Sequence, residues 1–111
     1  MIEPVQLFKC LADDTRLHAT LLIHLEGELC VCELMEALND SQSKISRHLA
    51  LLRSCGILED ARRGQWVFYS LAKDLPEWVS ETLRAANEAS ASTLKGFKKN
   101  LKAMKNRPQC C

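Results

Sequence analysis

Two cysteines separated by a single residue, Cys30 and Cys32, have the type and spacing to bind a soft metal ion. With Glu33 they match the capping box S/T-x-x-E, except that cysteine stands where the hydroxyl residue belongs. A helix is therefore predicted to start here, which places both sulfurs near unpaired backbone amides at the positive end of the helix dipole. Thiol pKa values fall in such positions, and thiolates bind soft metals well. The alternative is that both cysteines are semi-buried and only fill space.

The remaining cysteines are Cys10, Cys55 and the adjacent Cys110 and Cys111. The amino terminus has neither a basic nor an apolar signal region, so we expect a cytoplasmic protein. In a reducing cytosol, cysteines are more often metal-binding or catalytic than disulfide-paired, and Cys10 and Cys55 stand alone in the sequence. A thiol oxidoreductase would need C-x-x-C after a strand, and we predict neither that spacing nor a strand before Cys30. A soft-metal chaperone remains an alternative, because C-x-C and C-C both bind such ions.

A second group of candidate residues lies on the helix predicted for residues 42–54, which Ser41 caps. Its apolar side chains, Ile45, Leu49 and Leu52, share one face and belong to the core. The opposite face is small, polar and basic, and the helix contains no acidic residue. Arginine and glutamine can form paired hydrogen bonds with bases, while serine and lysine bind phosphates, so this face is typical of entry into a DNA major groove. The predicted DNA contacts on this face are Ser41, Gln42, Ser43, Lys44, Ser46 and Arg47.

A histidine and two arginines complete the candidate DNA contacts. His48 lies between the two faces of the same helix, where it either packs or contacts a phosphate. Arg62 and Arg63 stand at the tip of a predicted hairpin and can contact the flanking DNA backbone or the minor groove, with a solvated turn as the alternative. His18 and His24 lie six residues apart and cannot hold one ion on a single helix face, so we expect both to be structural or surface residues.

The elements that position these residues follow from hydrophobic spacing in a chain of 111 residues, which is long enough for one core. The first helix is predicted from Pro4, and the second begins after residues 13–14 and stops at Gly27. The third helix runs from the cysteine pair to Leu38. A short turn then leads to the capped helix with the polar face. Two helices joined by so short a turn form a helix-turn-helix.

The carboxyl-terminal half is predicted to contain a hairpin and a last helix. Residues 66–71 alternate in polarity as a strand does, and residues 57–62 can pair with them across a turn at 63–65. One helix follows, capped by Asp74, with an apolar seam suited to a partner helix. The seam consists of Leu94, Phe97, Leu101 and Met104. The predicted fold is mainly α with a small β-hairpin wing: a winged helix-turn-helix in one domain, 1–111, dimeric through its terminal helices.

The net charge is +1, but the charged residues are unevenly distributed along the chain. Residues 1–40 contain two basic and eight acidic side chains, residues 41–70 contain five and two, and residues 71–111 contain eight and four. The acidic first part and the basic remainder of the chain indicate a polyanion partner. The basic tail begins at about residue 98 and ends in cysteine. The longest apolar runs have only four residues, so no membrane span is predicted.

Two segments resemble the ArsR/SmtB family of bacterial metal-sensing repressors. Residues 28–34 have the sequence ELCVCEL, and residues 41–53 have the sequence SQSKISRHLALLR. Similarity at residues 7–17 and 64–67 extends the likeness to roughly 3–85, and it is greatest to the arsenic-responsive repressors. The resemblance implies a homodimer bound to double-stranded operator DNA upstream of its own resistance genes. Trivalent arsenic or antimony, bound by thiolates at the start of the third helix, would release it.

One position departs from the arsenic-responsive members of that family. They have C-V-C-D-L-C, whose last cysteine is the third ligand, and Met35 stands at that position here. A thioether is a weak substitute for a thiolate, and Met35 lies on the core face of the predicted helix. Cys110 or Cys111 is an alternative third ligand, acting within its own chain or across to the partner. The predicted metal ligands are Cys30, Cys32, Cys110 and Cys111.

Other members of the family bind other ions. A zinc site on the paired last helices would need histidine ligands there, and no histidine follows His48. A cadmium or lead site that adds an amino-terminal cysteine to the C-x-C could use Cys10, and a cadmium- or lead-responsive repressor is the alternative function. Cys55, at a helix end, ranks low as a ligand. No catalytic constellation is visible, so the sequence predicts a cytoplasmic, metalloid-responsive repressor rather than an enzyme.

Overall fold

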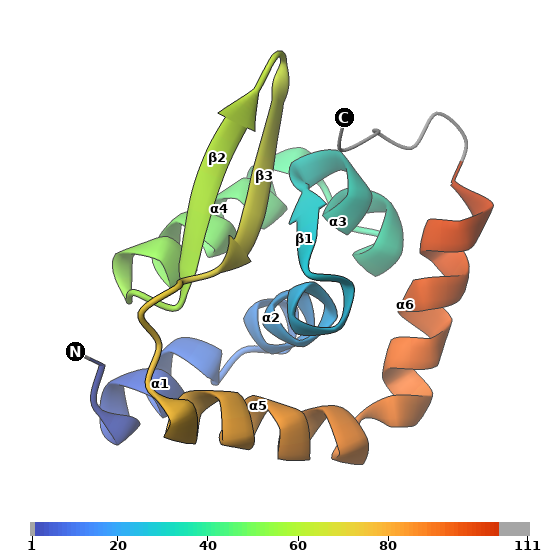
Figure 1. The fold of residues 1–111 in the computed structure, drawn as a ribbon. Coiled ribbons are helices and arrows are strands. Elements are labelled where there is room, and N and C mark those ends of the chain that lie inside the picture. Colours follow the sequence, from blue (N-terminus) through green and yellow to red (C-terminus); the bar gives the residue numbers. More distant parts are fainter. Residues whose placement is uncertain (1, 105–111) are drawn as a thin grey trace.

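The computed structural model describes residues 2–104, in which packed helices carry a small sheet whose hairpin projects from one side (Figure 1). The helices are α1 (Pro4–Leu11), α2 (Asp14–Glu26), α3 (Val31–Leu38), α4 (Gln42–Ser54), α5 (Glu77–Ala89) and α6 (Ala91–Ala103). The strands are β1 (Glu28–Cys30), β2 (Leu58–Arg63) and β3 (Trp66–Leu71). Each helix within residues 2–104 is too short or too polar to cross a membrane. The predicted fold class, mainly helical with a β wing, is confirmed.

Helix α2 lies at the centre of the molecule and contacts every other helix (Figure 1). Its residues Leu21, Leu22 and Ile23 are completely buried, and they form the middle of the hydrophobic core. The helix starts where predicted, because the Asp13 carboxylate accepts a hydrogen bond from the Arg16 amide at 3.1 Å. The helices that carry the candidate residues are thus arranged around a single rigid core.

Helices α3 and α4 form the predicted helix-turn-helix. The turn between them is residues 39–41, and Asn39 adopts a left-handed conformation with φ of 54°. Ser41 caps α4, with its hydroxyl oxygen accepting a hydrogen bond from the Lys44 amide at 3.3 Å. The predicted inward residues Ile45, Leu49 and Leu52 are completely buried, which fixes the polar side of α4 toward solvent.

The sheet has one more strand than predicted. Strands β2 and β3 form the expected antiparallel hairpin, and β1 pairs with the other side of β3, so that Cys30 lies opposite Phe68. The prediction that no strand precedes Cys30 is therefore wrong. A three-residue strand is too short to show an alternating pattern, and its hydrogen bonds go to a strand about 40 residues further along. The argument against a thiol oxidoreductase then rests on the C-x-C spacing and not on the absence of a strand.

The carboxyl-terminal segment forms two helices and not the single helix predicted. Helix α5 has Pro76 as its N-cap, rather than Asp74, and it ends at Ser90. Helix α6 then changes direction and lies along α3 (Figure 1). No proline or glycine marks the break, so its position is set by packing between distant segments and not by local sequence.

Long-range contacts attach α5 and α6 to the central helices. Asn87 donates a hydrogen bond to His24 at 2.6 Å, and the His18 and Phe97 rings lie 5.1 Å apart, so both histidines are structural as predicted. Leu94 and Leu101 are each only 2% exposed. Half of the predicted apolar seam on α6 is therefore buried within its own chain, and its contact with a partner subunit's helix stays a prediction.

Candidate nucleic-acid interface and metal centre

The cysteine pair lies where β1 ends and α3 begins. Cys30 is both the last residue of β1 and the N-cap of α3, and Cys32 lies in the first helical turn. Their Sγ atoms are 2.8 Å apart, and both thiols are free. Glu33 completes the capping box as predicted, since its carboxylate accepts a hydrogen bond from the Cys30 amide at 2.9 Å. Two sulfurs that converge in this way can bind the same soft ion.

Burial has the largest effect on the chemistry of Cys30, which is only 1% exposed. Loss of hydration, followed by the hydrogen bond with Cys32, raises the pKa of the Cys30 thiol to about 12. The predicted lowering of this pKa is wrong, because desolvation of the thiolate outweighs the effect of the helix start. Any soft ion that binds Cys30 must displace its proton. Cys32 is half-buried and offers the more accessible sulfur of the pair.

The structure brings no third strong donor to this pair within the residues it describes. No cluster of three or more histidine, cysteine or carboxylate side chains suited to a metal ion occurs in residues 2–104. Met35 is half-buried and packs against the core, as its helical position predicted. The two remaining predicted ligands, Cys110 and Cys111, lie outside the described residues.

Cys10 and Cys55 are joined by a disulfide, with their Cα atoms 6.7 Å apart. The sequence did not predict this bond, because cysteines of a reducing cytosol are more often metal-binding or catalytic than disulfide-paired. The two residues are 45 positions apart in sequence and meet because α1 packs near the end of α4. In this oxidised state the Cys10 thiol cannot serve as the extra ligand that a cadmium or lead site would need.

The polar side of α4 is presented as the sequence predicts. Ser41, Gln42, Ser43 and Arg47 are exposed, while Lys44 and Ser46 are half-buried. Lys44 also forms an ion pair with Asp40 at 3.4 Å across the turn. The six predicted side chains therefore occupy one amino-terminal surface of α4, rich in hydrogen-bond donors, which suits contact with base edges and phosphates.

His48 has a different environment from these residues. It is 7% exposed, accepts a hydrogen bond from Arg16 at 3.2 Å and lies 3.9 Å from the Asp13 carboxylate. Burial lowers the pKa of His48 below its usual value, and the nearby Asp13 only partly opposes this shift. The structure therefore does not present His48 to DNA. Of its two predicted roles, packing between α4 and α2 describes it.

The two wing arginines also differ from each other. Arg62 is exposed on β2. Arg63 forms an ion pair with Glu28 of β1, and its guanidinium lies 4.4 Å from the centre of the Phe68 ring. The two arginines are therefore not equivalent, because strand β1, which was not predicted, supplies a carboxylate for Arg63.

The sequence and fold match known regulators. Residues 13–60, which include α2, the cysteine pair and the helix-turn-helix, match the family described as "Bacterial regulatory protein, arsR family". The chain is 56% identical over 115 residues to the arsenic resistance transcriptional regulator ArsR2 of Pseudomonas putida, with 100% of each chain covered. The chain belongs to the arsR family. It is also 48% identical over 98 residues to the arsenical resistance operon repressor of Escherichia coli, covering 88% of this chain and 84% of that repressor.

Solved structures of similar proteins agree with this assignment to the arsR family. The antimony-specific transcriptional repressor AntR has a TM-score of 0.66 and 30% identity, covering 82% of this chain and 79% of AntR. Reduced HlyU from Vibrio cholerae has a TM-score of 0.67 and 35% identity, covering 77% and 85% of the two chains. The predicted family is confirmed, and this arsR-family protein is a transcription regulator and not an enzyme.

Two positioning contacts in this arsR-family protein were not predicted from its sequence. Arg53 of α4 forms an ion pair with Asp60 of β2 at 3.1 Å, which attaches the wing to the candidate DNA-binding helix. Arg16 donates hydrogen bonds both to His48 and to the backbone carbonyl of Cys10. Arg16 lies in one of the segments that resemble the family, and that was the only sequence signal for it.

Proposed function

We propose that this arsR-family protein is a metalloid-responsive repressor that binds operator DNA as a homodimer. Trivalent arsenic or antimony would bind the thiolates of Cys30 and Cys32 and release the protein from DNA. The observation that carries the proposal is the position of two free sulfurs, 2.8 Å apart, at the start of the helix that precedes α4. Relatives named as arsenic resistance regulators and the antimony-specific repressor AntR support this choice of ion.

The cysteine pair is placed where a small movement would reach both parts of the DNA interface. Helix α3 starts at Cys30 and leads through the turn of residues 39–41 into α4. Cys30 also pairs with Phe68 of β3, which belongs to the wing hairpin. An ion shared by the two sulfurs would distort the first turn of α3, and the strain would shift α4 and the wing together. Couplings of about 1–3 kcal/mol are common between such sites, so release would be complete only when both subunits are loaded.

A third sulfur ligand is part of the proposal. Thiolates are the soft donors that a trivalent metalloid prefers, and the Met35 thioether is a weak donor that packs against the core. Cys110 or Cys111 is the proposed third ligand. Replacing both with serine should leave operator binding intact and raise the arsenite concentration needed for release. If the release curve does not change, the terminal cysteines are not ligands.

The proposed DNA interface combines α4 with the wing. Gln42 and Arg47 would contact bases, and the neighbouring serines with Lys44 would contact phosphates. Arg62 would bind the flanking backbone or minor groove, and Arg63 would do so only after leaving Glu28. The full proposed set on α4 is Ser41, Gln42, Ser43, Lys44, Ser46 and Arg47, with His48 as a positioning residue.

The dimer is proposed to form through the outer face of α1. Val5 and Phe8 lie three residues apart on one side of this helix and are 66% and 56% exposed, which is costly for large apolar side chains in water. A second copy of the chain would cover them and place two α4 helices on half-sites about 34–36 Å apart, or a multiple of that. Phe8→Asp should raise the monomer fraction in analytical ultracentrifugation. An unchanged dimer fraction would exclude this face.

One titration tests the proposed function. The operator is first located by footprinting the DNA upstream of the gene, and a labelled operator fragment is then followed by fluorescence anisotropy. Arsenite, antimonite, cadmium, lead and zinc are each added to the complex, with the Cys30→Ser, Cys32→Ser double variant as control. Release of the wild-type protein by arsenite or antimonite, with a much weaker response of the variant, is the expected result.

Other outcomes of the same titration favour the alternatives. Release by cadmium or lead alone would support the repressor of the same family that responds to those ions. Absence of any sequence-specific complex would contradict a repressor and favour a soft-metal chaperone. Because a DNA-binding repressor works where the chromosome is, the proposal places the protein in the cytoplasm.

A further inference from the structure

The disulfide between Cys10 and Cys55 connects the amino-terminal helix to the helix proposed to enter the DNA groove. Cys10 lies in the last turn of α1, and Cys55 is the C-cap of α4. The Cα separation of 6.7 Å is within the range of protein disulfides. Forming or breaking this bond therefore changes how firmly the end of α4 is attached to the rest of the molecule.

A second connection reaches α4 from the same residue. Arg16 donates a hydrogen bond from Nε to the Cys10 carbonyl oxygen at 2.6 Å and another from Nη1 to His48 at 3.2 Å. Residue 10 is thus bound covalently to the end of α4 and, through Arg16, to its middle. A displacement of α1 at this point would act on α4 in two places.

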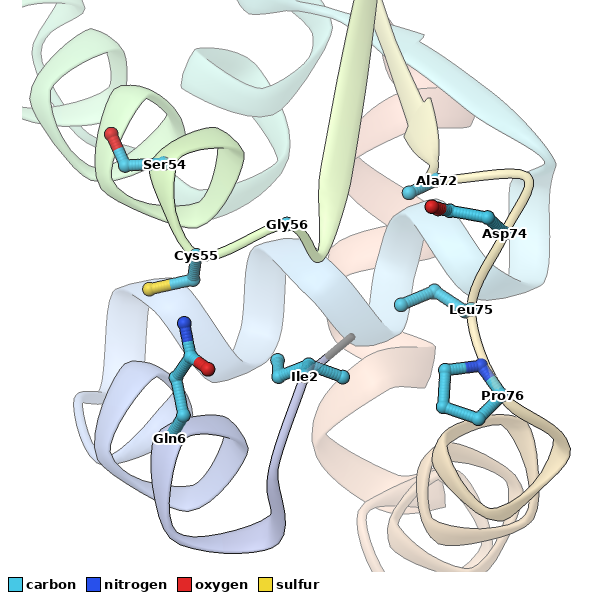
Figure 2. A pocket seen from close by; sticks show the side chains of 9 residues that line it. All are labelled: Ile2, Gln6, Ser54, Cys55, Gly56, Ala72, Asp74, Leu75 and Pro76. Atoms are coloured by element: carbon cyan, nitrogen blue, oxygen red, sulfur yellow. The ribbon is translucent and has the colours of Figure 1, made fainter.

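A cavity of about 600 Å³ borders this disulfide on the side of Cys55. Its lining comes from three segments of the chain: Ile2 and Gln6; Ser54, Cys55 and Gly56; and Ala72, Asp74, Leu75 and Pro76 (Figure 2). The Cys55 side chain points toward α1 and lies beside Gln6 (Figure 2). Both cysteines are half-buried and not sealed in the core, so a small oxidant or reductant can reach the sulfurs.

The compartment in which the protein works indicates what kind of disulfide this is. A DNA-binding protein works in a reducing compartment, where disulfides are usually transient and redox-sensing. We propose that Cys10 and Cys55 form a reversible redox site, oxidised by peroxide, whose disulfide increases operator affinity by fixing α4 against α1. This inference rests on the proposed DNA-binding function, but it concerns a pair of sulfurs separate from Cys30 and Cys32.

Peroxide would oxidise the pair in two steps. One thiolate attacks the peroxide oxygen, breaks the O–O bond and becomes a sulfenic acid, with the leaving hydroxide taking up a proton to give water. The second thiolate attacks the sulfenic sulfur, forming the S–S bond and releasing a second water. Two thiols and one hydrogen peroxide thus give one disulfide and two waters. A cellular dithiol reverses the step by exchange, supplying two electrons and two protons while it becomes a disulfide itself.

The disulfide is expected to raise operator affinity because α4 must lose conformational freedom when it binds DNA. In the reduced protein the end of α4 lacks its covalent attachment to α1 and keeps only non-covalent contacts, so it has more freedom to lose when the helix enters the groove. The disulfide removes this freedom beforehand, so the oxidised protein should bind operator about threefold to tenfold more tightly.

The test compares the full chain with the Cys10→Ser, Cys55→Ser double variant, each treated either with hydrogen peroxide or with excess dithiothreitol. Peptide mapping identifies the disulfides, and anisotropy with labelled operator gives the dissociation constants. We expect peroxide to produce the 10–55 disulfide and tighter binding in the wild type, and dithiothreitol to reverse both. The double variant should bind with the affinity of reduced wild type in either condition. The Cys10→Ala, Cys55→Ala variant repeats the control should serine disturb folding.

Each contrary result is decisive. Equal or weaker operator binding by the mapped 10–55 disulfide form would overturn the proposal. The same peroxide effect in the double variant would assign it to other cysteines and overturn it as well. If peroxide does not form the 10–55 disulfide, the redox site is excluded. Should neither redox state bind operator, the proposed repressor function fails, whereas the mapping still decides whether these two cysteines are the oxidised pair.

Discussion

The two cysteine pairs in the described part of the chain differ in how they are assembled and in their chemical state. Cys30 and Cys32 are two residues apart and meet because a helix begins there, and their thiols are free. Cys10 and Cys55 are 45 residues apart, meet because α1 packs near the end of α4, and are covalently joined. The first pair can gain or lose an ion without changing how the chain is connected. The second pair changes that connection itself.

Both pairs act on the same helix from different directions. The free pair reaches the start of α4 through α3 and the turn of residues 39–41, and the disulfide attaches the end of α4 to α1. A repressor built in this way has one site suited to a ligand and another suited to a covalent change. Four experiments test whether this division is real.

The largest expected difference between the pairs is in folding stability. Reducing the disulfide, or replacing Cys10 and Cys55 with serine, should lower the free energy of unfolding by about 2–4 kcal/mol, because the cross-link restricts the unfolded chain. Serine at 30 and 32 should change it by about 1 kcal/mol or less, since serine is a good N-cap residue. Urea unfolding with and without reductant measures both. Equal decreases in the free energy of unfolding in the two variants would show that the pairs do not differ in their contribution to stability.

The response to arsenite, unlike folding stability, should depend on Cys30 and Cys32 and not on Cys10 and Cys55. In the presence of reductant, serine at 30 and 32 should raise the arsenite concentration for half-release at least about tenfold, as expected for a coupling of about 1–3 kcal/mol. Serine at 10 and 55 should respond like the reduced wild-type protein. Operator anisotropy gives both curves. If the second variant also fails to respond, the two pairs form a single sensor.

A substitution on the outward face of α4 tests the element that both pairs are expected to move. Arg47→Ala should weaken specific operator binding by about 1–2 kcal/mol if Arg47 contacts a base, with little change on unrelated DNA. The matched control is Arg84→Ala, since Arg84 is exposed on α5 and pairs with Glu81 of the same helix. Equal weakening on specific and unrelated DNA would assign Arg47 to the phosphates.

The smallest effect is expected from His48, which lies between the two attachments of α4. Burial lowers its pKa below the usual 6.5, with Asp13 opposing the shift and Arg16, Arg47 and Lys44 adding to it. The unfolded chain therefore binds a proton more readily than the folded chain. Stability should be fully present above pH 6.5 and decrease as the pH falls through the lower folded value.

Thermal unfolding between pH 5 and 8 gives this pH dependence, with His48→Gln as the comparison. The variant keeps a hydrogen-bonding side chain of similar size but has no proton to gain in this range. The wild-type curve should be the steeper one below pH 6.5. Two parallel curves would show that groups other than His48 cause the dependence.

The features that the sequence predicted correctly are those with a local cause. The inward and outward faces of α4 follow from helical spacing, and the start of α3 follows from the run from Cys30 to Glu33. The caps at Asp13 and Ser41 follow from the hydrogen-bonding capacity of their side chains. Each of these needs only neighbours within one or two helical turns, and all of them position the candidate site.

The features that the sequence did not predict depend on segments far apart in the chain. Strand β1 exists because β3 pairs with it, and the break at Ser90 places Leu94 and Leu101 against the central helices. The pKa of Cys30 was predicted to fall from the helix start alone, whereas burial beneath the folded chain raises it. The pairing of Cys10 with Cys55 has no local signal, since no sequence pattern near either residue predicts its partner.

The ion pair between Arg63 and Glu28 has a consequence for how strongly salt should affect DNA binding. Binding to DNA releases about 0.9 condensed counterions for each phosphate that a cation neutralises. An arginine that must first leave a carboxylate adds little to that release, because the exposed carboxylate then attracts its own cation from solution. The slope of log affinity against log salt should therefore correspond to fewer phosphates than the number of cations on α4 and the wing. Glu28→Gln should make the slope steeper by up to about one ion per subunit.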